Sequence, residues 1–288
     1  MCDRDHFEEH RKELEAQGLM TRRQSGAMLG GLALAMLLPR AANAASVVES
    51  EVSIKTPDGT CDAYFVHPST GTAPGILFWP DIFGLRPALR QMGKRLAESG
   101  YSVLVVNSYY RVKKAPFAPT GPAGTPFKDM MPLFQTLSAQ TDLTDTKAFV
   151  AWLDQQPSVA KNRKIGTQGY CMGGTSALRA AAAAPDRIGA AASFHGYKLV
   201  TPGPDSAHTL AAGAKASLLI AIAAGDDAQA PDEKNVMKDT FAKAKVPAEI
   251  EVYGAPHGWC LPDFPIYNQP LAEKAWTRLL ALYSKALA

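Results

Sequence analysis

Three short runs in this 288-residue chain are apolar at almost every position. They are residues 75–79 (Gly-Ile-Leu-Phe-Trp), 102–106 (Ser-Val-Leu-Val-Val) and 217–222 (Ser-Leu-Leu-Ile-Ala-Ile). A strand with one exposed face alternates apolar and polar residues, whereas a strand buried on both faces does not. The runs therefore predict a mostly parallel sheet that helices cover on both faces.

Further strand-like runs alternate with helical patterns from residue 47 onward. Apolar residues recur at helical spacing between the runs, as in Leu89, Met92 and Leu96. The first two strand runs alternate more clearly than the others, as an edge hairpin does. Strands interleaved with helices in this way predict a single doubly wound α/β domain with an eight-stranded sheet. The expected strands are 50–55, 61–67, 75–79, 102–107, 164–168, 189–194, 216–223 and 248–253.

Residues 111–132 interrupt this rhythm with five prolines and no apolar periodicity. A loop of this length in a compact domain is usually functional or mobile. It follows the end of an expected strand, where α/β sheets place their ligand sites. We expect it to form a lid or a pocket wall; a merely flexible excursion is the alternative.

The first 44 residues have the layout of a targeting segment. Arg22 and Arg23 precede a weakly apolar run at 27–38, which is too short to span a bilayer, and small residues follow at 42–45. The segment resembles a twin-arginine signal, although Ser25-Gly26 stands where an apolar residue is usual. We therefore expect residues 1–44 to be an export signal read by the twin-arginine machinery. Residues 45–288 would form a periplasmic or secreted domain without stable membrane insertion. A general secretory signal or an N-terminal anchor is the alternative.

The composition excludes some classes of partner. The net charge is only +3, and no basic block gives the electrostatic footprint of nucleic-acid binding. No Cys/His cluster has metal-ligand spacing and no G-x-G-x-x-G occurs, so neither a metal nor an organic cofactor is expected. Without the cysteine of the signal, Cys61, Cys171 and Cys260 remain, and an odd number leaves at least one thiol unpaired. A Cys61–Cys260 bridge is possible, but the spacing does not support it.

The motif Gly-Tyr-Cys-Met-Gly-Gly at residues 169–174 lies between the expected strand 164–168 and an Ala-rich helical run. Glycines on either side of Cys171 permit a sharp strand-to-helix turn. Such a turn lifts the thiol above the sheet at a helix N-terminus, where the helix dipole favours the thiolate. The N–H of Met172 would then face a developing oxyanion. Cys171 is therefore a candidate nucleophile; a packed cysteine in a glycine turn is the alternative.

A thiol nucleophile needs a base, and the base needs an orienting acid. Asp226 and Asp227 follow the expected strand 216–223, and His257 follows 248–253. This gives the chain order nucleophile, acid, histidine that nucleophile-elbow hydrolases share. The proline four residues after Asp227 favours Asp227 as the acid, which leaves Asp226 as a helix cap or a turn residue.

Two further residues near these strand ends are candidates for substrate binding. His195 ends the strand 189–194, but it precedes the acid in the chain, so His257 is the better candidate for the base. Trp259 closely follows His257. We expect His195 and Trp259 to border the pocket, and a purely structural histidine is the alternative for His195.

Together these motifs resemble the dienelactone hydrolase family of α/β-hydrolases over nearly the whole chain from about residue 47. A further match is Trp-Pro-Asp-Ile-Phe-Gly at residues 79–84. At this place the family carries a carboxylate that hydrogen-bonds the resting cysteine, and the N–H of the next residue completes the oxyanion hole. The resemblance thus implies these roles for Asp81 and Ile82, although an acid at a strand end is also a plausible cap.

The resemblance also implies an activity. Tyr109 and Arg111 stand where the family places a Tyr-x-Arg that binds a substrate carboxylate; a surface arginine is the alternative. Family members that act on dienelactone carry a second arginine four residues after the histidine, where this chain has Leu261. The resemblance implies hydrolysis of a small ester or lactone through a Cys-His-Asp triad and an acyl-enzyme, but not dienelactone as the substrate. A ligand-binding or sensing protein on the same scaffold is the alternative.

Overall fold

The computed structural model describes residues 38–39 and 44–288, so the expected export signal lies almost wholly outside the described residues. The described chain forms one eight-stranded sheet in the order β1-β2-β4-β3-β5-β6-β7-β8. Strands β1 and β2 form the expected edge hairpin, β2 pairs antiparallel with β4, and the remaining pairs are parallel. The strands are β1 Val47–Thr56, β2 Gly59–Pro68, β3 Gly75–Trp79, β4 Ser102–Val106, β5 Ile165–Tyr170, β6 Ile188–Phe194, β7 Ser217–Ala223 and β8 Ala248–Tyr253.

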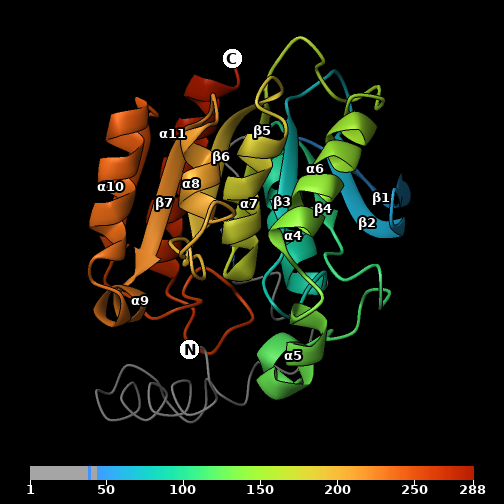
Figure 1. Ribbon diagram of the computed structural model, residues 1–288. Coiled ribbons are helices and arrows are strands. Elements are labelled where there is room, and N and C mark those ends of the chain that lie inside the picture. The colour runs from blue at the N-terminus through green and yellow to red at the C-terminus, as the bar shows by residue number, and fades with distance from the viewer. Residues whose placement is uncertain (1–37, 40–43) are drawn as a thin grey trace.

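Helices cover both faces of the sheet, as the apolar runs predict. Helices α4 and α11 pack on one face, and α6, α7, α8 and α10 pack on the other. Figure 1 shows α7 and α8 in front of the sheet and α11 behind it, with α5 and α9 near one end. The helices are α4 Pro87–Glu98, α5 Phe127–Phe134, α6 Ala139–Leu153, α7 Met172–Ala183, α8 Ala207–Ala212, α9 Ala224–Gln229, α10 Glu233–Ala244 and α11 Gln269–Ala286.

Successive side chains of a buried strand enter opposite layers of the core. Phe78 of β3 packs in the layer with α4 and α11, whereas Leu77 packs in the layer with α6 and α7. The two cysteines considered for a bridge are divided in the same way. Cys260 lies in the first layer and Cys61 in the second, and both are buried free thiols. The sheet separates them, so no bridge joins them.

The proline-rich excursion after β4 runs along the edge where the parallel strands end. The ring of Phe117 contacts that of Tyr109, with ring centroids 5.4 Å apart. The ring of Phe134, at the end of α5, contacts that of Tyr197 in the loop after β6 at 5.7 Å. The contact of Phe117 places the excursion beside the end of β4, and its role as a lid or pocket wall stays a prediction.

The turn between β5 and α7 is the tightest junction in the fold. A Cβ atom at Gly169 would lie 1.9 Å from the carbonyl oxygen of Gly173. A Cβ atom at Gly173 would lie 2.4 Å from the carbonyl oxygens of both Trp79 and Pro80. The first turn of α7 therefore touches the backbone at the ends of β3 and β5, and only glycine fits at these two positions.

In the part of the chain that the structure describes, the helices are too short or too polar to cross a membrane.

We expect Gly173→Ala to lower the free energy of unfolding by about 1–3 kcal/mol, because the new methyl group must displace two backbone carbonyl groups. Gly254→Ala is the matched control, since a Cβ at Gly254 meets no atom within 4 Å. We expect the control to stay within about 0.5 kcal/mol of the parent protein. Urea unfolding of both variants is the measurement, and equal stabilities would contradict the assigned contact.

Candidate active site

Cys171 stands at the turn between β5 and α7 in a strained conformation, with φ 55° and ψ −123°. Its N–H donates to the carbonyl oxygen of Phe194 and to Nδ1 of His195, both at 3.1 Å. Its carbonyl oxygen accepts from the N–H groups of Gly174 at 3.0 Å and Tyr197 at 3.1 Å. These hydrogen bonds hold the strained residue, and its side chain is partly exposed.

His195 is fully buried directly after β6. A backbone N–H can only donate, so the bond from Cys171 makes Nδ1 of His195 an acceptor and places the ring proton on Nε2. Burial, reinforced by the neighbouring His257, holds the pKa of His195 well below its ordinary value. His195 is therefore a neutral ring with an Nε2–H donor that contacts the backbone of the candidate nucleophile. It is fully buried and does not line the cleft described below, so its role as a pocket residue stays a prediction.

His257 follows β8 and lies against His195, with ring centroids 4.6 Å apart in an edge-to-face arrangement. Its Nδ1 lies 2.8 Å from Oδ2 of Asp226. A carboxylate accepts a hydrogen bond at this distance, so Nδ1–H is the stable tautomer and the lone pair is on Nε2. This tautomer leaves Nε2 of His257 able to accept a proton.

The acid beside His257 is Asp226 and not the predicted Asp227. Oδ1 of Asp227 lies 2.7 Å from Nζ of Lys234 in α10. Both aspartates are in the first turn of α9, where consecutive side chains diverge by about 100° around the helix axis. Only one of them can therefore face the imidazole. The proline at 231 comes after the end of α9 and does not determine which one does.

Tyr109 connects the two backbone segments expected to supply oxyanion donors. Its hydroxyl donates to the carbonyl oxygen of Ile82 at 3.0 Å and contacts Sδ of Met172 at 3.2 Å. Burial raises the pKa of Tyr109, and the nearby Asp81 and Cys171 raise it further, so the hydroxyl stays protonated. In the described part of the chain, the N–H groups of Ile82 and Met172 donate to no other backbone group. Tyr109 therefore connects the two segments instead of binding substrate as predicted, because it is buried and its hydroxyl already contacts Ile82 and Met172.

Asp81 belongs to a buried ion cluster that the sequence did not indicate. Arg86 donates to both oxygens of Asp81 at 2.8 Å, and to Oδ2 and Oδ1 of Asp263 at 2.6 and 2.9 Å. Asp81 also accepts from the N–H of Phe83 at 2.8 Å. The cluster ties the loop after β3 to the segment that follows His257. The predicted contact between Asp81 and the thiol stays a prediction, and the carboxylate's contacts here are structural.

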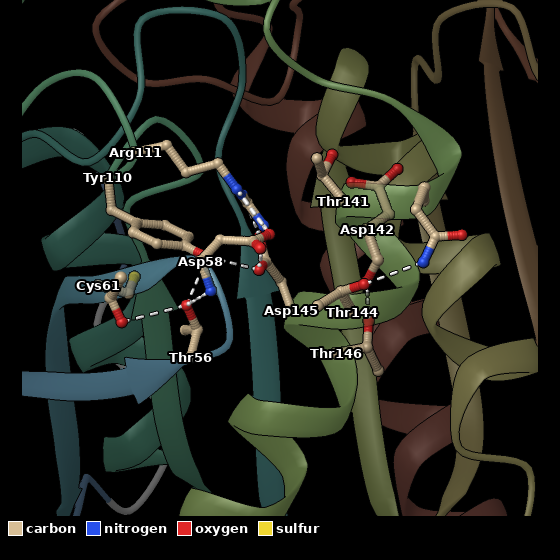
Figure 2. Close-up of polar contacts among 12 residues, drawn as sticks. Thr56, Asp58, Cys61, Tyr110, Arg111, Thr141, Asp142, Thr144, Asp145 and Thr146 are labelled. Atoms are coloured by element: carbon tan, nitrogen blue, oxygen red, sulfur yellow. Dashed lines mark hydrogen bonds and ion pairs between the residues drawn. The ribbon is translucent and has the colours of Figure 1, made fainter.

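Arg111 is held by two acidic partners, Asp58 and Asp145 (Figure 2). Its guanidinium lies 2.6 Å from Oδ2 of Asp58 and 2.7 Å from Oδ1 of Asp145 in α6, above the ring of Tyr110. Two carboxylates therefore satisfy the charge that the sequence assigned to a substrate carboxylate. The sequence could not reveal this, because Asp58 and Asp145 are distant along the chain.

Three buried ring nitrogens near Cys171 have no hydrogen-bond partner within the described residues: Nε2 of His195, Nε2 of His257 and Nε1 of Trp259. The rings are in contact, since His195 lies 4.6 Å from His257 and 5.4 Å from Trp259 between centroids. Buried polar atoms without partners are rare in folded proteins. Two donors and one acceptor are thus gathered around the ring of His195, and the binding role expected of Trp259 stays a prediction.

A cleft of about 570 Å³ opens beside His257. Its walls come from the loop at 196–200, where Tyr197 contacts α5, and from the segment 226–236 that carries Asp226. The volume suits a small organic molecule. In the described part of the chain, no three His, Cys, Asp or Glu side chains are grouped so that they could hold a metal ion.

A strained nucleophile turn after a central strand, with an acid and a histidine after two later strands, defines an α/β-hydrolase. Residues 61–287 match the model of the Dienelactone hydrolase family. The chain belongs to the dienelactone hydrolase family, and it is a hydrolase of the lactone and ester type.

Individual relatives agree with this assignment. The chain is 28% identical over 244 residues to a carboxymethylenebutenolidase of Rhodococcus opacus, an alignment that covers 81% of this chain and 90% of the relative. Its fold is similar to that of a dienelactone hydrolase-like promiscuous phosphotriesterase from metagenomic libraries, with a TM-score of 0.69, 20% identity and coverage of 84% and 100%. A dienelactone hydrolase from Anabaena variabilis gives a TM-score of 0.56 at 17% identity, with coverage of 84% and 99%.

Proposed function

We propose that the protein hydrolyses a small ester or lactone through Cys171, His257 and Asp226 by way of an acyl-enzyme. The observation that carries the proposal is the arrangement around the strained turn: the backbone N–H of Cys171 contacts His195, the ring of His195 packs against His257, and Asp226 orients His257. The family of the chain and the carboxymethylenebutenolidase relative support this class of reaction.

In the first half-reaction, Nε2 of His257 takes the proton of the Cys171 thiol, and the sulfur attacks the carbonyl carbon of the substrate. The N–H groups of Met172 and Ile82 stabilise the negative oxygen of the tetrahedral intermediate. The carbon–oxygen bond to the leaving group then breaks, and His257 returns its proton to the leaving oxygen. Asp226 keeps the imidazole in the required tautomer and stabilises its charged form.

In the second half-reaction, His257 takes a proton from water, and the resulting hydroxide attacks the thioester carbon. The carbon–sulfur bond breaks, and the proton returns to the sulfur of Cys171. The products are a carboxylic acid and the free thiol, so neither a metal nor a redox partner enters the balance.

We also propose that residues 1–44 direct the protein through the twin-arginine machinery to the periplasm or the exterior. The support is the arginine pair, the short apolar run and the small residues at 42–45.

We expect Cys171→Ala to lower kcat for p-nitrophenyl acetate by about 10³-fold or more, since the nucleophile is lost. Cys61→Ala is the control, because that thiol is buried in the opposite layer of the core. Iodoacetamide followed by mass spectrometry should label Cys171 faster than Cys61 or Cys260. Undiminished hydrolysis by Cys171→Ala would refute the nucleophile, and an unreactive Cys171 would favour a binding protein on this scaffold.

The neighbouring aspartates should respond differently to the same substitution. Asp226→Asn should lower kcat/KM by about 10²–10⁴-fold, because an amide no longer favours the Nδ1–H tautomer of His257. Asp227→Asn should change it less than about threefold, because it removes only a partly exposed ion pair with Lys234. A larger loss of kcat/KM for Asp227→Asn than for Asp226→Asn would instead identify Asp227 as the acid that orients His257.

Two variants separate the functions of the two His195 nitrogens. His195→Asn can place an oxygen near the Nδ1 position and keep the bond from the Cys171 N–H, whereas His195→Gln can place an N–H near the Nε2 position. If Nε2–H binds a substrate oxygen, His195→Asn should lower kcat/KM by about 10²-fold, as for loss of one donor, and His195→Gln should lower it by less. Steady-state kinetics on both variants, with thermal unfolding as a check, is the measurement. A more active Asn variant would limit His195 to positioning Cys171.

A further inference from the structure

The cleft beside His257 lies next to the imidazole that, in the proposed reaction, gives a proton to the leaving group. In the proposed reaction, His257 returns its proton to the leaving oxygen, so that oxygen must lie next to the imidazole. His257 and Asp226 both line the cleft. The part of the substrate beyond the leaving oxygen therefore occupies this space, and the charges around it determine which leaving groups are accepted.

The lining of the cleft carries more negative than positive charge. Three carboxylates contribute, those of Asp226, Asp232 and Glu233, against the single ammonium of Lys198. Lys198 lies 5.2 Å from the ring centroid of its neighbour Tyr197. Glu233 accepts the N–H of Val200 at 2.7 Å and is held in the wall. Burial raises the pKa of Glu233, and the negative charge of Asp226 raises it further. The two carboxylates are therefore close enough to repel one another.

Three cations in the segments that follow β3, β4 and β7 are already paired with carboxylates. Arg86 is buried between Asp81 and Asp263. Arg111 lies between Asp58 and Asp145, and Lys234 contacts Asp227. Recruiting any of them for an anionic substrate would leave a buried or half-buried carboxylate without its partner.

We propose that the cleft selects esters and lactones whose leaving group is uncharged or cationic, and that it disfavours those bearing a carboxylate there. The inference rests on the proposed function, since it assigns the leaving-group side from the role of His257. A negative potential in a cleft lowers the local concentration of anions, so discrimination of about 10-fold or more is expected.

The test compares two acetate esters that differ in one charge, 4-acetoxybenzoate and its methyl ester. We expect kcat/KM, divided by the rate constant of spontaneous hydrolysis, to be at least about 10-fold higher for the methyl ester. Raising the ionic strength from about 0.01 to 1 M should increase kcat/KM for 4-acetoxybenzoate and leave that for the methyl ester nearly unchanged, because salt screens like charges.

Single variants assign the effect to the cleft. Asp232→Asn and Glu233→Gln should each lower the ratio of kcat/KM for the methyl ester to kcat/KM for 4-acetoxybenzoate. The amide oxygen introduced by Glu233→Gln can still accept a hydrogen bond from the N–H of Val200. Asp186→Asn is the matched control: it changes the net charge equally, but Asp186 is exposed and lies just before β6, at the end of the sheet where the parallel strands begin. The control should leave the ratio unchanged.

The outcomes separate the two proposals. If neither ester is hydrolysed in a manner that depends on Cys171, the proposed function fails. If hydrolysis depends on Cys171 but the two esters react equally, or the carboxylate ester reacts faster and is slowed by salt, only the charge selection is overturned. A ratio that Asp186→Asn alters as much as Asp232→Asn would also overturn it.

Discussion

The backbone contact between α7 and the ends of β3 and β5 is the constraint on which the site depends. Gly169 and Gly173 allow this contact, since a methyl group at either position would overlap a carbonyl oxygen. The close approach forces Cys171 into its strained conformation and places it at the N-terminus of α7. One packing requirement thus positions the sulfur, the dipole of the helix and the N–H of Met172 together.

Around this junction, long-range contacts hold loops that are distant in sequence. Tyr109 joins the backbone at Ile82 to the side chain of Met172, and Arg86 joins Asp81 to Asp263. The first contact connects the two segments that carry the proposed oxyanion donors. The second connects the loop after β3 to the segment that follows His257. Such preorganisation lets donors act without reorganising during the reaction.

The sequence was sufficient for the fold and for the positions of the main catalytic candidates along the chain. Apolar runs mark strands buried on both faces, and all the expected strands occur within a few residues of their expected ends. The glycines around Cys171 likewise predict the turn, because their requirement is local. His195 could be placed at a strand end for the same reason.

The remaining assignments depended on where side chains point and which remote residues they meet, and local sequence does not encode either. Asp226 and Asp227 are adjacent on one helical turn, and only the three-dimensional orientation of α9 decides which of them faces His257. Arg111 and Tyr109 are at the expected strand end, but partners from remote segments occupy their polar atoms. Arg86 and Asp263 were missed because they are 177 residues apart and neither belongs to a motif.

The distribution of thiols has a consequence for oxidative damage. Cys61 and Cys260 are enclosed in the two layers of the core, where burial raises the pKa of each, so neither is available as a resolving partner for Cys171. Within residues 44–288, a sulfenic acid formed on Cys171 could not be converted to a disulfide without unpacking the core. Its recovery would depend on a thiol from outside this domain, and without one peroxide would oxidise the sulfur to the sulfinic state.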